Sequence, residues 1–209
     1  MTIGMIANLM SIPIGIVCLY ISLRAFYIYN LSRSDMVYVL GLSMASIAVG
    51  TFLGTVGDAH VAGNTLNMDW SRAYGACCGG LFIFLSSFMS SHKQMQQLKR
   101  WQLLAIVVFV LVLLLTPLYP PTKSPPIAFC LNASRMVIYT CAFIRYFYLY
   151  LSKGTRFSLI MWMSFLILIA GYALNVPGIL QGGLAIVTIL AAIVRITAYL
   201  TILAAYSIG

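Results

Sequence analysis

Acidic side chains are almost absent from this chain. Its 209 residues include three acidic residues against 12 lysines and arginines, so the formal net charge is +9. All three acids are aspartates, and charged residues make up only 7% of the chain, far below the share of about 25% in soluble domains. No segment is both long and polar enough to form a soluble domain.

Apolar residues fill the chain instead. They account for 62% of the sequence, and the mean hydropathy is +1.01, more apolar surface than a soluble protein of this size can bury. At about 20 residues per span, the length leaves room for about seven spans with short loops. We therefore predict an all-α seven-transmembrane-helix bundle, a single domain over residues 1–209, inserted as a multi-pass protein in the cell membrane.

Apolar runs and polar breaks locate the expected spans. Residues 1–20 show neither a basic leader nor a small-residue cleavage site, so we expect a first span there and not a signal peptide. Loops are expected at the basic segment 92–100, at the proline-rich segment 119–126 and at the Gly/Pro segment 175–183. Every lysine is thus predicted to lie in a loop. The predicted helices cover residues 3–29, 36–56, 71–91, 101–118, 127–151, 157–174 and 184–206.

The basic residues predict the orientation. Basic loop residues stay on the cytoplasmic side of a membrane, and they concentrate in the first, third and fifth predicted loops. The other loops hold only Lys123, with Arg72 just inside the third predicted helix. The N-terminus is therefore expected outside and the C-terminus inside. The residues that carry this bias are Arg33, Lys93, Lys99, Arg100, Lys153 and Arg156.

Small residues predict where two helices touch. Gly50 and Gly54 are four residues apart in the second predicted helix, and Gly75 and Gly79 have the same spacing in the third. Because lipid supplies no hydrophobic drive between helices, such spacing favours close backbone contact. We expect these two helices to form a tight pair, although the same motif also suits a homo-oligomer.

Two arginines lie well inside predicted spans. Arg195 falls near the middle of the seventh helix and Arg135 in the outer half of the fifth. A charge at that depth costs at least about 2.5 kcal/mol on the insertion scale, so some group has to offset it. None of the three aspartates is placed at mid-membrane depth, although Asp58 could reach Arg135 or Arg72. An internal polar network is one answer, and a bound carboxylate or lipid phosphate is the other.

The second answer predicts a binding pocket between the last three helices. Asn132 lies three residues before Arg135 and so shares its helical face. The hydroxyl of Tyr172 in the sixth helix and the amide of Asn175 at the start of the following loop complete the set. The predicted ligand-binding residues are Arg135, Arg195, Asn132, Tyr172 and Asn175.

A weaker polar cluster is expected at the outer face. Asp58, His60 and Asp69 could hold a metal or respond to pH, but their spacing lacks the helical i, i+4 pattern, and capping or solvated-loop roles fit them better. The five cysteines all fall in apolar segments without zinc-site spacing. We therefore predict neither a metal nor a cofactor.

These observations favour a receptor-like seven-helix sensor. It would bind a small anionic or amphiphilic ligand between helices and signal to a cytoplasmic or membrane partner. A small transporter or channel subunit for anions or metabolites is the second hypothesis, and a lipid-modifying membrane enzyme the third. The lipid bilayer, with its anionic lipids, is the expected surrounding partner, and the basic excess is assigned to it and not to nucleic acid. Retinal proteins need a lysine in the seventh helix, and none is present here.

Overall fold

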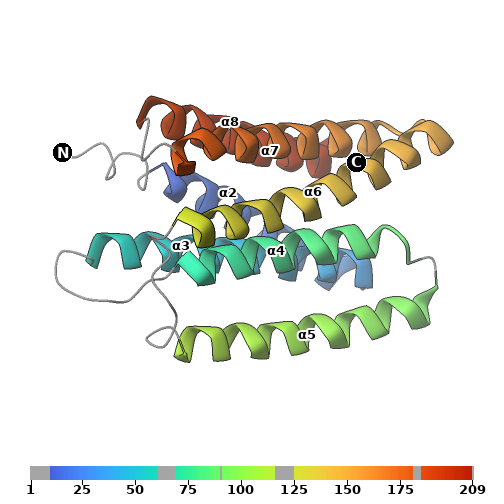
Figure 1. Cartoon of the computed structure of the whole chain (residues 1–209). Coiled ribbons are helices and arrows are strands. Elements are labelled where there is room, and N and C mark those ends of the chain that lie inside the picture. The colour runs from blue at the N-terminus through green and yellow to red at the C-terminus, as the bar shows by residue number, and fades with distance from the viewer. Residues whose placement is uncertain (1–9, 61–68, 90, 116–124, 181–184, 209) are drawn as a thin grey trace. The chain divides into compact units, whose positions relative to one another are not determined.

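Every regular secondary-structure element in the described part of the chain is an α-helix. The computed structural model describes residues 10–60, 69–89, 91–115, 125–180 and 185–208, and within them no strand occurs (Figure 1). The all-α prediction is confirmed. The helices are α2 (Ser11–Ser32), α3 (Asp35–His60), α4 (Asp69–Ser86), α5 (His92–Leu114), α6 (Pro125–Lys153), α7 (Arg156–Leu180) and α8 (Ala185–Ile208).

Six of these helices are long and apolar enough to cross a membrane, which identifies a multi-pass membrane protein. The exception among the described helices is α4. It has 18 residues, begins with Asp69 and carries Arg72 in its first turn, so its polar start lowers its mean hydropathy. The number of crossings and the orientation therefore stay predictions.

The predicted loop at 92–100 is wrong, because α5 begins at His92. The side chain of Gln94 accepts a hydrogen bond from the backbone N–H of Ser91 at 3.4 Å, half of the reciprocal bonding that starts many helices. Lys93 and Lys99 are consequently helical, and Lys153 is the last residue of α6. The rule that every lysine lies in a loop fails for these three.

Two other predicted loops, at 119–126 and 175–183, also have the wrong bounds. Pro125 and Pro126 occupy the first turn of α6, where a missing N–H costs no helical hydrogen bond. Pro177 lies inside α7, which continues to Leu180, so the predicted turn at 175–183 starts too early. A membrane helix tolerates a proline in its interior because neighbouring helices satisfy the backbone groups that the proline leaves without a partner. At the other extreme, α4 ends at Ser86, five residues before the predicted end.

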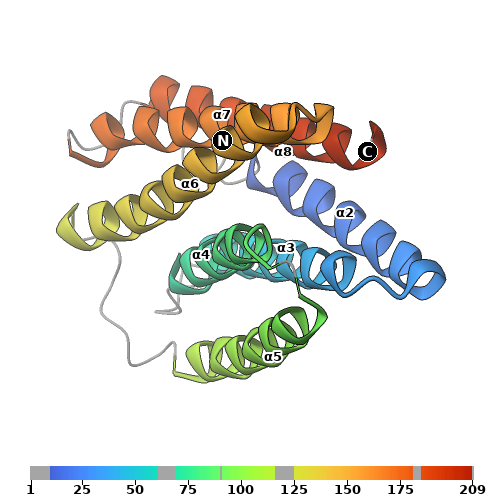
Figure 2. The same cartoon turned by 90° about the vertical axis from the view of Figure 1, so that its right-hand side faces the viewer.

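The described chain forms two compact units. The N-terminal unit contains nearly all of α2 together with α3, α4 and α5, and the C-terminal unit contains α6, α7 and α8 (Figures 1 and 2). Each is described here by itself.

In the N-terminal unit, α3 and α4 run antiparallel with their backbones in contact. A Cβ atom on Gly50 would lie 2.7 Å from the Ser71 carbonyl oxygen, and one on Gly79 would lie 2.7 Å from that of Ser43. A Cβ on Gly54 would meet the Arg72 guanidinium. All four glycines of the predicted pair lie in this contact, the fourth being Gly75 against Gly50 and Ser46. The glycines supply no side chain of their own, so the two backbones approach closely here.

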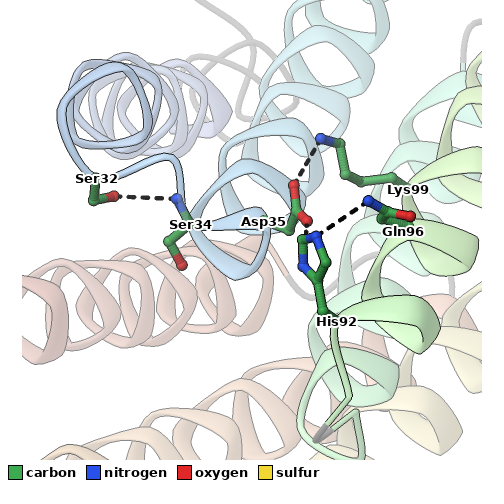
Figure 3. Close-up of polar contacts among 6 residues, drawn as sticks. All are labelled: Ser32, Ser34, Asp35, His92, Gln96 and Lys99. Atoms are coloured by element: carbon green, nitrogen blue, oxygen red, sulfur yellow. Dashed lines mark hydrogen bonds and ion pairs between the residues drawn. The ribbon is translucent and has the colours of Figure 1, made fainter.

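Helices α3 and α5 begin at the same end of the N-terminal unit. Asp35, the first residue of α3, accepts a hydrogen bond from Lys99 Nζ at 2.8 Å and lies 3.2 Å from His92 Nδ1 (Figure 3). Further along, Gln102 Nε2 donates to the Val39 carbonyl oxygen at 2.9 Å. Since α4 is antiparallel to α3, it brings the chain back to the end where α3 began.

In the C-terminal unit, α7 packs against both α6 and α8, and neighbours run antiparallel. Between α6 and α7, Tyr139 stacks on Tyr172 with centroids 5.5 Å apart, and Tyr146 stacks on Phe165 at 5.6 Å. Between α7 and α8, Phe157 meets Tyr206 at 5.2 Å. Aromatic contacts therefore follow the length of α7.

Candidate functional site

Two arginines from different helices converge on one tyrosine ring. The guanidinium carbon of Arg135, on α6, lies 5.6 Å from the ring centroid of Tyr172, on α7. The guanidinium carbon of Arg195, on α8, lies 5.3 Å from the same centroid. Both distances are within cation–π range. Helices α6 and α8 thus each place a positive charge beside one ring of α7 inside the C-terminal unit.

A glycine makes room for Arg195. A Cβ atom on Gly171 would lie 2.7 Å from Cγ of Arg195, so the aliphatic stem of the arginine lies directly against the backbone of α7. Its Nε donates to the Ala191 carbonyl oxygen at 3.1 Å. This bond directs the guanidinium group along α8, where it lies beside the Tyr172 ring.

Asn132 joins the site from the face of α6 that carries Arg135. Its Nδ2 donates a hydrogen bond to the Tyr172 carbonyl oxygen at 3.0 Å. A backbone oxygen inside a helix normally accepts from its own helix, so this bond links α6 to the backbone of α7. Oδ1 of Asn132 and Nε of Arg135 are both buried and have no hydrogen-bond partner among the described atoms. Buried polar atoms in this state are costly, so the site has unused acceptor and donor capacity.

No described carboxylate neutralises the two arginines. Asp35 binds Lys99 and His92 in the N-terminal unit. Asp69 pairs with Arg72 at 3.3 Å. The third aspartate, Asp58, belongs to α3, but its side chain lies outside the described part. Two like charges without a described counter-charge favour the approach of an anion.

The structure gathers four of the five predicted pocket residues, namely Arg135, Arg195, Asn132 and Tyr172. Asn175 lies one helical turn further along α7 and forms no hydrogen bond to another described residue of this group. Of the predicted outer cluster, Asp69 is the first residue of α4. The side chain of His60 lies outside the described residues, as does that of Asp58, so the cluster stays a prediction.

Sequence reasoning missed two members of the site. Tyr139 stacks on Tyr172, and its hydroxyl lies 3.3 Å from that of Tyr199. It follows Asn132 by seven residues and Arg135 by four, so the 3.6-residue helical period could have identified it. Gly171 carried no such signal, because nothing in the sequence shows which side chain a glycine in α7 accommodates.

The arrangement suits binding better than bond-breaking chemistry. Its described polar groups are guanidinium, amide and phenol, which donate hydrogen bonds to an anion. They include no base paired with a nucleophile. Around them lie the buried, stacked rings of Tyr139 and Tyr172, which give the group an apolar surrounding.

Comparisons with family models, curated proteins and solved structures found no match to this chain. Its function is therefore argued from the site alone.

Proposed function

We propose that this protein is a receptor-like membrane sensor that binds a small anionic amphiphile in its C-terminal unit. The carboxylate or phosphate of the ligand lies between Arg135 and Arg195, and its apolar portion lies against the aromatic side chains. The observation that carries this proposal is the convergence of both guanidinium groups on Tyr172 without a described carboxylate beside them.

Two positive charges held close together in a membrane interior carry an energetic cost. Two guanidinium groups that share one aromatic ring repel each other, and the low dielectric of the membrane interior strengthens that repulsion. Cation–π contact offsets part of the cost, by about 2 kcal/mol or more for a desolvated pair. An anion would offset more, because charge-assisted hydrogen bonds to guanidinium are among the strongest in proteins.

The placement of the site supports a sensing role. Arg135, Tyr172 and Arg195 belong to three different helices, so a ligand that binds all of them links the relative positions of α6, α7 and α8. A ligand shifts a conformational equilibrium by its differential affinity for the two states. A conformation that holds the two arginines close together binds an anion more tightly than one that holds them apart, which supplies this difference in affinity.

Ligand-dependent stabilisation tests this proposal. The full chain in a neutral detergent is titrated with dodecanoate, and with dodecanol as the uncharged amphiphile of equal chain length. We expect dodecanoate to raise the unfolding temperature in a saturable way. Arg135→Gln and Arg195→Gln should each lower the apparent affinity by at least about tenfold, because a hydrogen bond to a charged group contributes about 1.5–3 kcal/mol.

Arg156→Gln is the matched control, since Arg156 is exposed at the start of α7 and loses the same charge. It should bind dodecanoate like the parent. Equal stabilisation by dodecanol, or equal affinities in all three variants, would contradict the proposal. Uptake of the anion into proteoliposomes that is lost in Arg195→Gln would show that the protein is a transporter and not a sensor.

A further inference from the structure

A hollow of about 460 Å³ lies in the N-terminal unit, where α4 ends and α5 begins. This volume falls in the range of about 300–1,000 Å³ that is typical of small-molecule sites. Four of its six lining residues are apolar. The lining consists of Leu85, Met89, Gln94, Gln97, Leu98 and Trp101.

The floor of the hollow is apolar and fixed. Leu98 is only 3% exposed and belongs to a buried hydrophobic cluster, against which Leu85 and Met89 pack. Trp101, in contrast, is 58% exposed. Core packing therefore holds the floor in place, and an indole side chain forms one wall that a ligand can reach.

The rim of the hollow is polar and basic. Gln94 and Gln97 are exposed lining residues. Lys93 and Arg100 are also exposed, and their separation by seven residues places them on one face of α5, next to the stripe of Gln94, Gln97 and Trp101. Two cations thus stand beside an apolar hollow.

These two cations have no described acidic partner. Asp35, the aspartate at this end of the unit, is already bound by Lys99 and His92 (Figure 3). Lys99 and His92 belong to the side of α5 that faces α3. Neither Lys93 nor Arg100 forms an ion pair with a described residue, so their charge is available to an outside anion.

From this geometry we infer a binding site for one anionic phospholipid. An acyl chain fills the hollow against Leu85, Met89 and Trp101, and the phosphate lies at the rim beside Lys93 and Arg100. Charge complementarity selects an anionic headgroup, and the apolar lining selects a chain. The site belongs to the N-terminal unit and does not rest on the function proposed for Arg135 and Arg195.

Quenching of Trp101 fluorescence tests the inference. Trp70→Phe and Trp162→Phe leave Trp101 as the sole tryptophan, and the full chain is reconstituted with phosphatidylglycerol or phosphatidylcholine carrying the same brominated acyl chains. We expect phosphatidylglycerol to be preferred. The double variant K93Q/R100Q should reduce the relative association constant by at least about fivefold, since each basic residue near a membrane surface contributes about 1 kcal/mol.

Two controls separate a site from general attraction. The double variant K153Q/R156Q removes the same charge from exposed positions in the other unit and should keep the preference. Filling the hollow by Gln97→Phe should lower quenching by phosphatidylglycerol without a change of charge, whereas Leu104→Phe, exposed further along α5, should not.

Several results would overturn the inference. These are equal quenching by the two lipids in the parent protein, an unchanged preference in K93Q/R100Q, and an equal loss in K153Q/R156Q. Absence of quenching by either lipid would mean that protein covers the hollow, as a second copy of the chain would.

Discussion

Asp35 shows how single residues balance charge in this protein. Its carboxylate binds Lys99 at 2.8 Å and His92 at 3.2 Å, and its side chain is only 10% exposed. Lys99 also lies over the rings of Tyr38, at 4.4 Å, and Tyr29, at 5.3 Å. One aspartate and two aromatic rings therefore stabilise a partly buried ammonium group, whereas Arg135 and Arg195 share a ring without a described carboxylate.

Removing the Asp35 carboxylate should destabilise the N-terminal unit. Asp35→Asn leaves Lys99 charged, 24% exposed and without its counter-ion, so we expect a loss of about 1–3 kcal/mol in the free energy of unfolding. His92→Gln should cost less than about 1 kcal/mol, because His92 is 74% exposed and exposed ion pairs contribute little. Thermal unfolding in detergent measures both. An equal effect of the two variants would show that Lys99 does not depend on Asp35.

At the scale of elements, glycines determine where two helices come into close contact. Where α3 meets α4, glycines bring backbone against backbone. Where α7 meets α8, Gly171 accommodates the stem of Arg195. Helix α5 differs, since its first turns carry polar and basic residues, and it reaches α3 through the side chains of Gln102 and Lys99.

The α3–α4 contact predicts a sharp response to one methyl group. In Gly75→Ala the new Cβ would meet the Ser46 carbonyl oxygen and lie 3.3 Å from Gly50 Cα, so both helices have to move apart. We expect a loss of about 1–3 kcal/mol in unfolding free energy. Gly178→Ala makes the same substitution where the Cβ would lie 3.4 Å from Thr188 Oγ1, and it should be neutral or slightly stabilising. Equal effects at the two positions would show that the α3–α4 contact tolerates a side chain.

At the scale of the whole molecule, the N-terminal unit bears on the number of crossings. Asp35 and Lys99 hold the starts of α3 and α5 at the same end, and α4 runs antiparallel to α3 between them. If α3 crosses the membrane, the chain has to return through α4 before α5 begins. Seven crossings stay a prediction that depends on α4, the described helix outside the six that are long and apolar enough to cross a membrane.

Cysteine accessibility tests the predicted topology. In a cysteine-free background, single cysteines replace Ser32, Ser91, Lys153 and Pro125, all exposed at helix ends. Seven crossings with the N-terminus outside predict that a membrane-impermeant maleimide labels Pro125→Cys in intact cells. The other three should react only after permeabilisation. Labelling of Ser32→Cys and Ser91→Cys on opposite sides would show that α4 does not cross.

Composition and local pattern predicted the class of fold, and they singled out four side chains that the structure brings together around Tyr172, whereas their role as a binding site stays a prediction. Apolar runs identify a helical membrane protein, and the 3.6-residue period places Asn132 and Arg135 on one face of α6. The errors lie at polar or proline-containing ends, at residues 92–100 and at Pro177. At the first of these, the Lys99 side chain pairs with Asp35, which is distant in sequence, and at the second α7 continues past Pro177.

Sequence by itself determined that the chain is helical, enters a membrane and carries arginines in apolar segments, because these properties follow from side-chain type and local order. Tertiary structure alone decided that Arg135 and Arg195 both lie beside Tyr172 and that Asp35 accepts a hydrogen bond from Lys99. The residues of each group are tens of positions apart, and only the antiparallel return of the helices brings them together. Electrostatic attraction and repulsion act over the resulting distances in space, which local sequence order does not specify.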